Sequence, residues 1–405
     1  MLYAIHELHH AALAPWNAAA RASLDLLTSP FSPFSYFPAS RKFAAGTEVF
    51  CRLTQRYGKP AFDITETVID GRSVAVREVA MIDKPFCRLL HFRRDARRND
   101  PKVLLVAPLS GHHATLLRDT VRALLPEHEV FLTDWVNARE VPISHGAFHL
   151  DDYVDYIREF IRALGPEAHV ISVCQPTVPV LAAVALMADA GERVAPRSMV
   201  MMGGPIVTRR SPTAVNDLAV RKSLAWFEHH VIATVPAKYP GCMRRVYPGF
   251  LQYTGFVAMN PSRHMDAHWD FYHHLVEGDG ESAEAHRQFY DEYNAVLDMP
   301  AEYYLDTIRV VFKEHALPRG SWRVRGDPVR PQAISRTALM TVEGEFDDIS
   351  GSGQTEAAHA LCTGIPAKKR EHFFVPRVGH YGIFSGRRWR ESIYPRIRDF
   401  IRKHA

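Results

Sequence analysis

The sequence predicts an α/β protein with a mostly parallel central sheet. From Val103 onward, short apolar runs rich in β-branched residues alternate with helix-like runs, and the loops between them are short. The alternation stops over residues 204–333, which are rich in Trp, Tyr, Phe and His, and then resumes. Such a pattern packs helices on both faces of a sheet and gathers the loops that follow the strands at one edge.

The alternating elements can be assigned from their length and composition. Strands are expected at Val103–Ala107, Glu129–Asp134, His169–Val173, Ser198–Met202, Thr337–Val342 and His372–Val375. Helices are expected at Ala114–Leu125, Asp151–Leu164, Val178–Met187 and Arg387–Arg402. The interrupting stretch predicts a largely helical cap over the sheet.

The first part of the chain shows a different pattern. Residues 1–28 predict one amphipathic helix broken at Pro15. The stretch Pro30–Pro38 holds four aromatic residues among three prolines, which predicts an extended arm without regular structure. Strand-like alternation over Phe62–Val79, with Asp70-Gly71 at its centre, predicts a β-hairpin.

Together these patterns divide the chain into four parts. We expect an N-terminal extension at 1–95, a first part of the α/β core at 96–203, a cap at 204–333 and a second part of the core at 334–405.

Composition excludes several classes of function. The 405 residues include 49 basic and 45 acidic ones, and the net charge of +4 is too small to predict nucleic-acid binding. Five cysteines without a C-x-x-C pair predict neither a zinc site nor a disulfide framework and favour a reducing compartment. No signal peptide and no membrane-spanning run is recognisable. We expect no cofactor and no metal.

The turn after the strand His169–Val173 is the first candidate for chemistry. It reads Ser172-Val173-Cys174-Gln175-Pro176 between a buried strand and a helix. In hydrolases built on this unit the turn reads G-x-S-x-G, and its sharpness lifts the central side chain above the sheet edge. Here the nucleophile would be the thiol of Cys174. The alternative is an inert cysteine, because Cys is among the most buried residue types.

A thiol nucleophile needs a base and an acid that holds the base, and both follow later strands. The histidine candidate is His380, in a Gly-His-Tyr-Gly loop after the last strand. The preferred acid is Asp347, with Glu343, Glu345 and Asp348 as alternatives in the same loop. The chain order nucleophile, acid, histidine is the order of α/β-hydrolases.

The remaining parts of such a site can also be assigned. The first oxyanion donor should be the N–H of Gln175, and the second the N–H of Leu109 or Ser110 in the first sheet loop. Trp135 ends a strand at the same edge and is expected to shape the pocket. Substrate-binding residues are also expected among the aromatic residues of the cap, namely Phe250, Tyr253 and Phe256.

At these residues the sequence resembles the intracellular poly(3-hydroxybutyrate) depolymerases, cysteine-nucleophile α/β-hydrolases related to the polyhydroxyalkanoate synthases. The resemblance runs from MLYAIHELHHAAL through SVCQPTVPV and GEFDDIS to VGHYGIFSG. The synthase elbow resembles G-x-C-x-G, which Ser172 and Pro176 do not match. The resemblance implies an α/β-hydrolase fold and a Cys174–Asp347–His380 triad.

The resemblance also implies a biological setting. The substrate would be the amorphous polyester of storage granules, and the chain would be cytoplasmic and bound to the granule surface. Two alternatives stay open at this point: a synthase or thioesterase acting on 3-hydroxyacyl-CoA, and a granule-coating protein without activity. The sequence also leaves open whether the chain forms a homo-oligomer.

Overall fold

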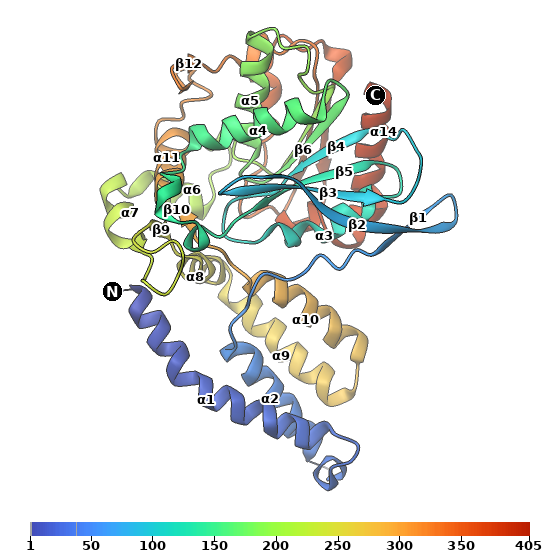
Figure 1. Cartoon of the computed structure of the whole chain (residues 1–405), viewed down its shortest axis with the longest axis vertical. Coiled ribbons are helices and arrows are strands. Elements are labelled where there is room, and N and C mark those ends of the chain that lie inside the picture. Colours follow the sequence, from blue (N-terminus) through green and yellow to red (C-terminus); the bar gives the residue numbers. More distant parts are fainter. Residues whose placement is uncertain (1, 38) are drawn as a thin grey trace.

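A nine-stranded sheet organises the chain, which the computed structural model describes over residues 2–37 and 39–405 (Figure 1). The strand order is β1-β2-β3-β5-β4-β6-β7-β13-β14. In chain order the strands are β1 (Glu66–Ile69), β2 (Arg72–Asp83), β3 (Cys87–Arg94), β4 (Lys102–Val106), β5 (Glu129–Trp135), β6 (Ala168–Val173), β7 (Ser198–Met202), β13 (Ala338–Gly344) and β14 (Arg370–Val375).

From β5 to β14 the sheet is parallel, and its centre is fully buried. Every residue of β6 and β7 is buried, as expected for strands covered on both faces. The register pairs Val173 at the end of β6 with Met202 at the end of β7. The loops that follow these strands therefore leave the sheet side by side.

Helices cover both faces of this sheet. Helices α4 and α5 lie on one side, and α3 and α14 lie on the other (Figure 1). The helices of the α/β core, these four included, are α3 (Arg118–Leu124), α4 (Leu150–Leu164), α5 (Thr177–Asp189), α12 (Ala358–Leu361), α13 (Gly386–Arg388) and α14 (Tyr394–His404). The predicted α/β-hydrolase fold is confirmed.

The chain between β7 and β13 is mainly helical. Its helices are α6 (Ala214–Arg221), α7 (Leu224–His230), α8 (Gly249–Met259), α9 (Pro261–Glu277), α10 (Gly280–Asn294) and α11 (Ala301–Thr307). Its short strands are β8 (Ala233–Thr234), β9 (Arg245–Tyr247), β10 (Met299–Pro300), β11 (Arg323–Val324) and β12 (Asp327–Pro328). The first three form one small sheet and the last two form another.

Three antiparallel strands extend one edge of the central sheet. The predicted hairpin is confirmed, with Ile69 paired to Arg72 across the Asp70-Gly71 turn. The sequence analysis missed β3, which lies between β2 and β5. The strands within residues 66–94 thus belong to the central sheet, whereas the prediction counts them in an N-terminal extension at 1–95. The adjacent Leu89 and Leu90 break the alternation by which a strand is recognised.

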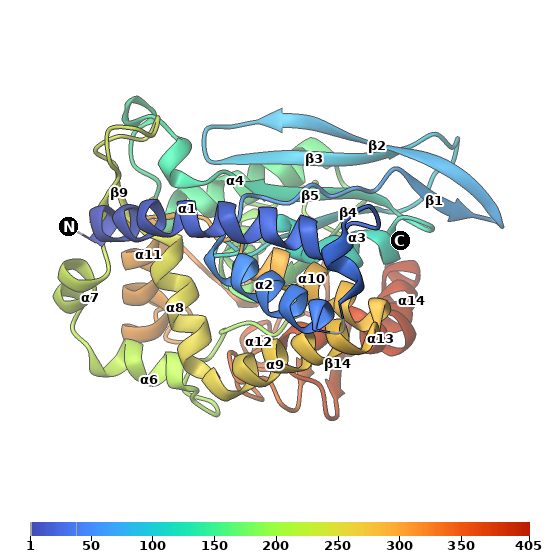
Figure 2. The same ribbon diagram turned by 90° about the horizontal axis from the view of Figure 1, so that it is seen from below.

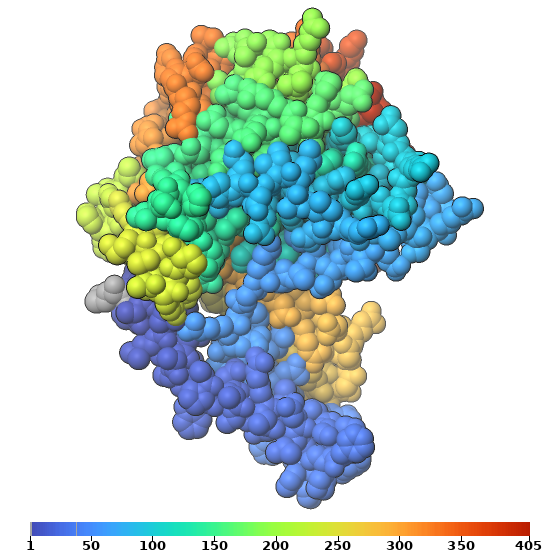
Figure 3. Space-filling model, viewed as in Figure 1, coloured from blue at the N-terminus to red at the C-terminus, as the bar shows by residue number. Residues whose placement is uncertain are grey.

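Four helices form a lobe that projects from the α/β body (Figures 1 and 3). It consists of α1 (Leu2–Thr28), α2 (Ser40–Thr54), α9 and α10, each packed on the next. The sequence analysis missed α2. The predicted break at Pro15 is wrong, because α1 continues through it. Pro15 and Ala11 are both exposed, so the carbonyl left without an N–H partner is open to water.

The predicted aromatic arm is not wholly irregular. Residues Pro33–Tyr36 form a short 3₁₀ helix, η1, whose N-terminal cap is the side chain of Ser32. Pro33 suits its first turn, where no N–H is needed. Pro38, the last residue of the predicted arm, lies outside the described residues.

Two predicted helices are divided in the structure. The stretch Ala114–Leu125 begins as a 3₁₀ turn before α3 starts at Arg118. The closing helix is preceded by a π-helical turn, Trp389–Ile393, and Pro395 then opens α14. Because proline has no N–H to donate, it interrupts the hydrogen-bond ladder at that point. In the described ranges, no helix has the length and apolarity that crossing a bilayer requires.

Candidate active site

Cys174 lies in a strained turn between β6 and α5. Its φ angle is +69°, in the left-handed region that residues other than glycine rarely adopt. Its N–H donates to the carbonyl of Met202 at 2.7 Å, which ties the turn to the end of β7. Its side chain is partly exposed, unlike the buried Cys51, Cys87 and Cys362. A strained backbone that presents a side chain at the sheet edge is the geometry of a nucleophile elbow.

His380 and Asp347 form a buried pair beside this turn. Nδ1 of His380 lies 2.7 Å from Oδ2 of Asp347. The other oxygen of Asp347 accepts hydrogen bonds from the N–H groups of Ile349 at 2.9 Å and Ser350 at 2.7 Å. The carboxylate is therefore fixed by its own loop, and it orients the imidazole so that Nε2 is free for another partner.

The pKa of His380 reports its surroundings. Burial of the imidazole lowers that pKa, but the charge of Asp347, the Cys174 side chain and hydrogen bonds to both raise it more, so the pKa lies well above its usual value. The Cys174 side chain thus lies close enough to His380 to affect the charge of the imidazole. An imidazole that holds a proton next to a thiol is suited to stabilise the thiolate form.

The other acidic candidates have different partners. Asp348 accepts a hydrogen bond from Asn260 of the cap at 2.6 Å. Glu343 is buried and accepts bonds from three backbone N–H groups, including that of Thr355 at 2.7 Å. Glu345 accepts one from the N–H of Arg377 at 2.8 Å. Asp347 is the acid that the structure pairs with His380.

The predicted oxyanion donors lie in two loops at the same edge. Within the described part of the chain, the N–H groups of Gln175, Leu109 and Ser110 donate no intramolecular hydrogen bond. Ala107, two residues before Leu109, is held from both sides, because its N–H donates to Thr133 and its carbonyl accepts from the Trp135 indole at 2.8 Å. These free donors are available to a ligand.

Comparison with known families covers half of the chain. The model for the PHB de-polymerase C-terminus matches residues 203–405. The chain belongs to the PHB depolymerase family. Asp347 and His380 lie within the matched residues, whereas Cys174 lies before them. Membership in the depolymerase family makes the chain a hydrolase of carboxylic esters.

Some solved structures show a likeness to the chain. They include an esterase from Thermogutta terrifontis, 12% identical, with a TM-score of 0.42, over 84% of this chain and 98% of that one. They also include a monoacylglycerol lipase from Paleococcus ferrophilus, 11% identical, with a TM-score of 0.45, over 75% of this chain and 95% of that one. Neither likeness bears on substrate or site. No curated protein matches the chain.

Two of the residues predicted to bind substrate have structural partners in this member of the depolymerase family. Trp135 is buried and stacks on Tyr153 at 4.2 Å between ring centroids. Phe250 packs against Tyr3 of α1 at 5.5 Å and against His6 at 4.1 Å. One face of each ring is therefore covered by another ring, and contact of these two residues with substrate stays a prediction.

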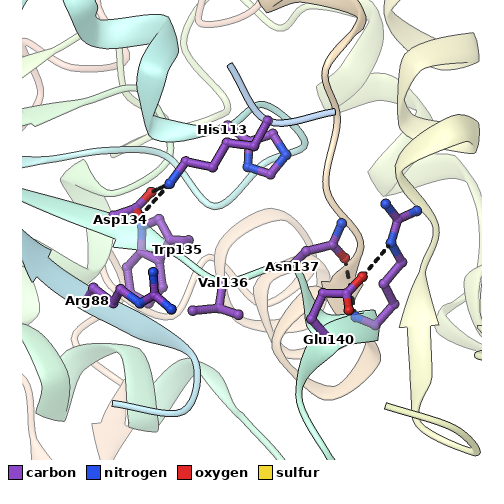
Figure 4. A pocket seen from close by; sticks show the side chains of 9 residues that line it. Arg88, His113, Asp134, Trp135, Val136, Asn137 and Glu140 are labelled. Carbon is purple, nitrogen blue, oxygen red and sulfur yellow. Dashed lines mark hydrogen bonds and ion pairs between the residues drawn. The ribbon is translucent and has the colours of Figure 1, made fainter. Parts of the chain in front are cut away.

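Trp135 is one of the residues that line a polar pocket (Figure 4). It has a volume of about 280 Å³, and its charged residues are paired: Lys59 with Asp134, Arg139 with Glu140, and Arg88 with Asp83 outside the lining. His113 also lines it, and burial lowers the pKa of that histidine to about 3. A pocket whose charges are already paired gives no indication of a ligand.

A second, aromatic hollow lies next to the His380–Asp347 pair. Its volume is about 310 Å³, and it lies between α8–α10 and the loops that carry Asp348 and Tyr381. Its walls are mainly aromatic and imidazole rings, namely Phe256, His264, His286, Phe289, Tyr290, Tyr293 and Tyr381. The predicted Phe256 lies in this wall, and the predicted Tyr253 packs behind it against Tyr293 at 6.2 Å.

Three residues of the site escaped the sequence analysis. Gly203 has φ of +54°, and a Cβ there would lie 3.0 Å from Oδ2 of Asp347. Tyr303 of α11 is buried beside Cys174 and Gln175. His112 stacks on Phe256 at 4.9 Å, and burial lowers its pKa to about 4, so it is neutral at pH 7. These three residues come near His380 and Asp347 only in the folded chain. None of them belongs to a sequence motif by which it could be recognised.

Proposed function

We propose that the chain hydrolyses poly(3-hydroxybutyrate) through an acyl-Cys174 intermediate. The observation that carries the proposal is the strained turn of Cys174 next to a histidine that is itself hydrogen-bonded to a buried aspartate. Family membership supports the polyester as substrate. The substrate in the cell is then the amorphous polymer of cytoplasmic storage granules, as the sequence resemblance implies.

The first half of the reaction forms a thioester. His380 holds the proton of the Cys174 thiol at Nε2, and the sulfur attacks the ester carbonyl carbon as a thiolate. The negative charge that develops on the carbonyl oxygen is stabilised by the N–H of Gln175 and by that of Leu109 or Ser110. When the C–O bond breaks, His380 returns the proton to the departing alkoxide, which leaves as the 3-hydroxyl end of the shortened polymer.

The second half releases the acyl group. Neutral His380 accepts a proton from water, the hydroxide attacks the thioester carbonyl, and the Cys174 thiolate leaves. Asp347 holds the imidazole in one tautomer in both halves and stabilises the imidazolium that forms. The product is an acid with a free 3-hydroxyl group.

The aromatic hollow is the proposed binding site for the chain of the polymer. Its rings offer apolar contact area with little loss of side-chain entropy, which suits an uncharged polyester. Tyr381 lies between the hollow and His380, with 5.8 Å between the ring centroids of the two residues. A polymer segment bound there would have an ester group near the thiol.

Product analysis tests the proposal. The purified protein is incubated with amorphous poly(3-hydroxybutyrate) particles and, separately, with 3-hydroxybutyryl-CoA. We expect soluble 3-hydroxybutyrate or its oligomers from the particles, and no product from Cys174→Ala. Cys174→Ser should be strongly impaired, because the site is shaped for a larger and more acidic thiol. Release of CoA without attack on particles would instead indicate a thioesterase.

A further inference from the structure

The lobe carries a large apolar surface that the fold leaves uncovered. We propose that this surface binds the polyester directly and docks the enzyme on it; the inference rests on the proposed function. It consists of the outward stripe of α1 and the aromatic residues around η1, which we call the docking face: Ile5, Leu8, Trp16, Leu26, Phe31 and Phe34.

The stripe of α1 follows helical spacing. Ile5, Leu8, Trp16 and Leu26 all lie on the side opposite Tyr3 and Asn17, which are the buried residues of the helix. Leu8 is 72% exposed and Trp16 is 68% exposed. A helix that is apolar on both sides is normally buried on both. Here one side packs on α2 and the other faces solvent (Figure 2).

The tip of the lobe is also apolar and exposed. Phe31, directly after α1, is 95% exposed, and Phe34 in η1 is 54% exposed. Folding does not require an apolar side chain at positions so exposed to solvent. Exposed apolar groups that gather on one part of a surface mark an interaction site.

The absence of charge on the stripe identifies the kind of partner. α1 has three charged residues, Glu7, Arg21 and Asp25. Glu7 faces Arg56 and Lys238, and Arg21 bonds to Asn17 and Gln55. Helices that lie on anionic membranes carry many Lys and Arg residues on their polar face, and α1 carries one arginine. An uncharged stripe matches an uncharged polymer.

The lobe also connects the docking face to the proposed substrate site. Arg52 of α2 pairs with Asp291 of α10 at 2.7 Å, and Arg287 of α10 pairs with Glu48 of α2 at 2.7 Å. Helices α9 and α10 provide most of the wall of the aromatic hollow. The lobe that carries the docking face therefore also forms part of the wall of the hollow.

Binding and hydrolysis are tested separately in three proteins. The parent is compared with Leu8→Ser/Trp16→Ser/Phe31→Ser and with a control, Val79→Ser/Met81→Ser/Ile143→Ser, whose three apolar residues are exposed on the α/β body. Hydrolysis of p-nitrophenyl butyrate, a soluble ester, should be equal in all three. Co-sedimentation with bare amorphous poly(3-hydroxybutyrate) particles should weaken at least about tenfold in the first variant only.

The other outcomes would overturn the proposal. Equal sedimentation of the parent and the first variant with the particles would place docking elsewhere. Binding of the parent to phosphatidylglycerol vesicles, without binding to particles, would identify a membrane surface. A change of oligomeric state in the first variant, with polymer binding retained, would identify an interface between copies. If the parent cleaved neither p-nitrophenyl butyrate nor the polymer particles, the proposed function would be rejected. The sedimentation measurements would still test whether the docking face binds the polymer.

Discussion

At the scale of single residues, the structure pairs His380 with one of two adjacent aspartates. Asp347 is buried and receives two backbone N–H bonds in addition to His380, whereas Asp348 faces the cap and bonds to Asn260. The sequence could place both residues after a strand and before the histidine. It could not fix which of the two points inward, because the path of a loop depends on the backbone bonds that the loop makes.

The acid can be tested by substitution at both positions. Asp347→Asn should lower turnover on p-nitrophenyl butyrate by about 10⁴, because His380 would lose the partner that fixes its tautomer. Asp348→Asn should change turnover little. Steady-state kinetics of the two variants give the ranking, and the opposite ranking would assign the acid to Asp348.

Gly203 affords a second test at this scale. Gly203→Ala would place a methyl group 2.6 Å from Ile383 and 3.0 Å from the Asp347 carboxylate, and it would strain a backbone with φ of +54°. Gly191→Ala is the matched control, because φ is +67° there and nothing lies within 4 Å. Both variants should lose about 1–2 kcal/mol of unfolding free energy from the backbone. Only Gly203→Ala should also lose activity; equal activity in both would separate Gly203 from the site.

At the scale of elements, recognition from sequence follows the strength of the local pattern. The strands of the parallel core are continuous apolar runs and were predicted to within a few residues. Helix α2 was missed because its buried residues are small, namely Ser40, Ala44, Ala45 and Cys51. Strand β3 was missed because the adjacent Leu89 and Leu90 break its alternation of apolar and polar residues, although β2 and β5 flank it in the sheet.

The contact of α1 with the cap predicts how stability depends on pH. Tyr3 donates a hydrogen bond to Asp298, which lies before β10, and burial raises the pKa of Asp298 to about 7. In the unfolded chain the pKa of Asp298 has its ordinary value of 3.8. Between that pH and pH 7 the folded protein therefore keeps a proton on Asp298 that the unfolded chain has released. Stability from this group is therefore present at low pH and is lost as the pH rises towards 7, by about 1.4 kcal/mol per pH unit.

Denaturation at several pH values checks this expectation. Asp298→Asn mimics the protonated carboxyl, so between pH 5 and pH 7 the unfolding free energy of the parent should fall relative to that of Asp298→Asn, by about 1.4 kcal/mol per pH unit. Asp266→Asn, at an exposed position of α9, should have the same pH dependence as the parent. Parallel curves for the parent and Asp298→Asn in urea titrations would show that this carboxyl is ionised in the folded state.

At the scale of the whole molecule, the parallel sheet accounts for the meeting of residues far apart in the chain. Cys174 follows β6, and Asp347 and His380 follow β13 and β14, so the shared strand direction brings the three loops to one edge. The sequence predicts this much, because each residue follows its strand. The aromatic hollow and Tyr303 depend on how the cap packs over that edge, which no local pattern specifies.

The central claim is that the ester substrate is carried on the Cys174 sulfur. The most direct measurement is mass spectrometry of the protein after rapid acid quenching during turnover of a soluble 3-hydroxybutyrate oligomer. We predict a 3-hydroxyacyl adduct on the peptide that contains Cys174, more abundant in Asp347→Asn if deacylation becomes slow, and absent from Cys174→Ala. An adduct on another residue, or full hydrolysis by Cys174→Ala, would contradict the account.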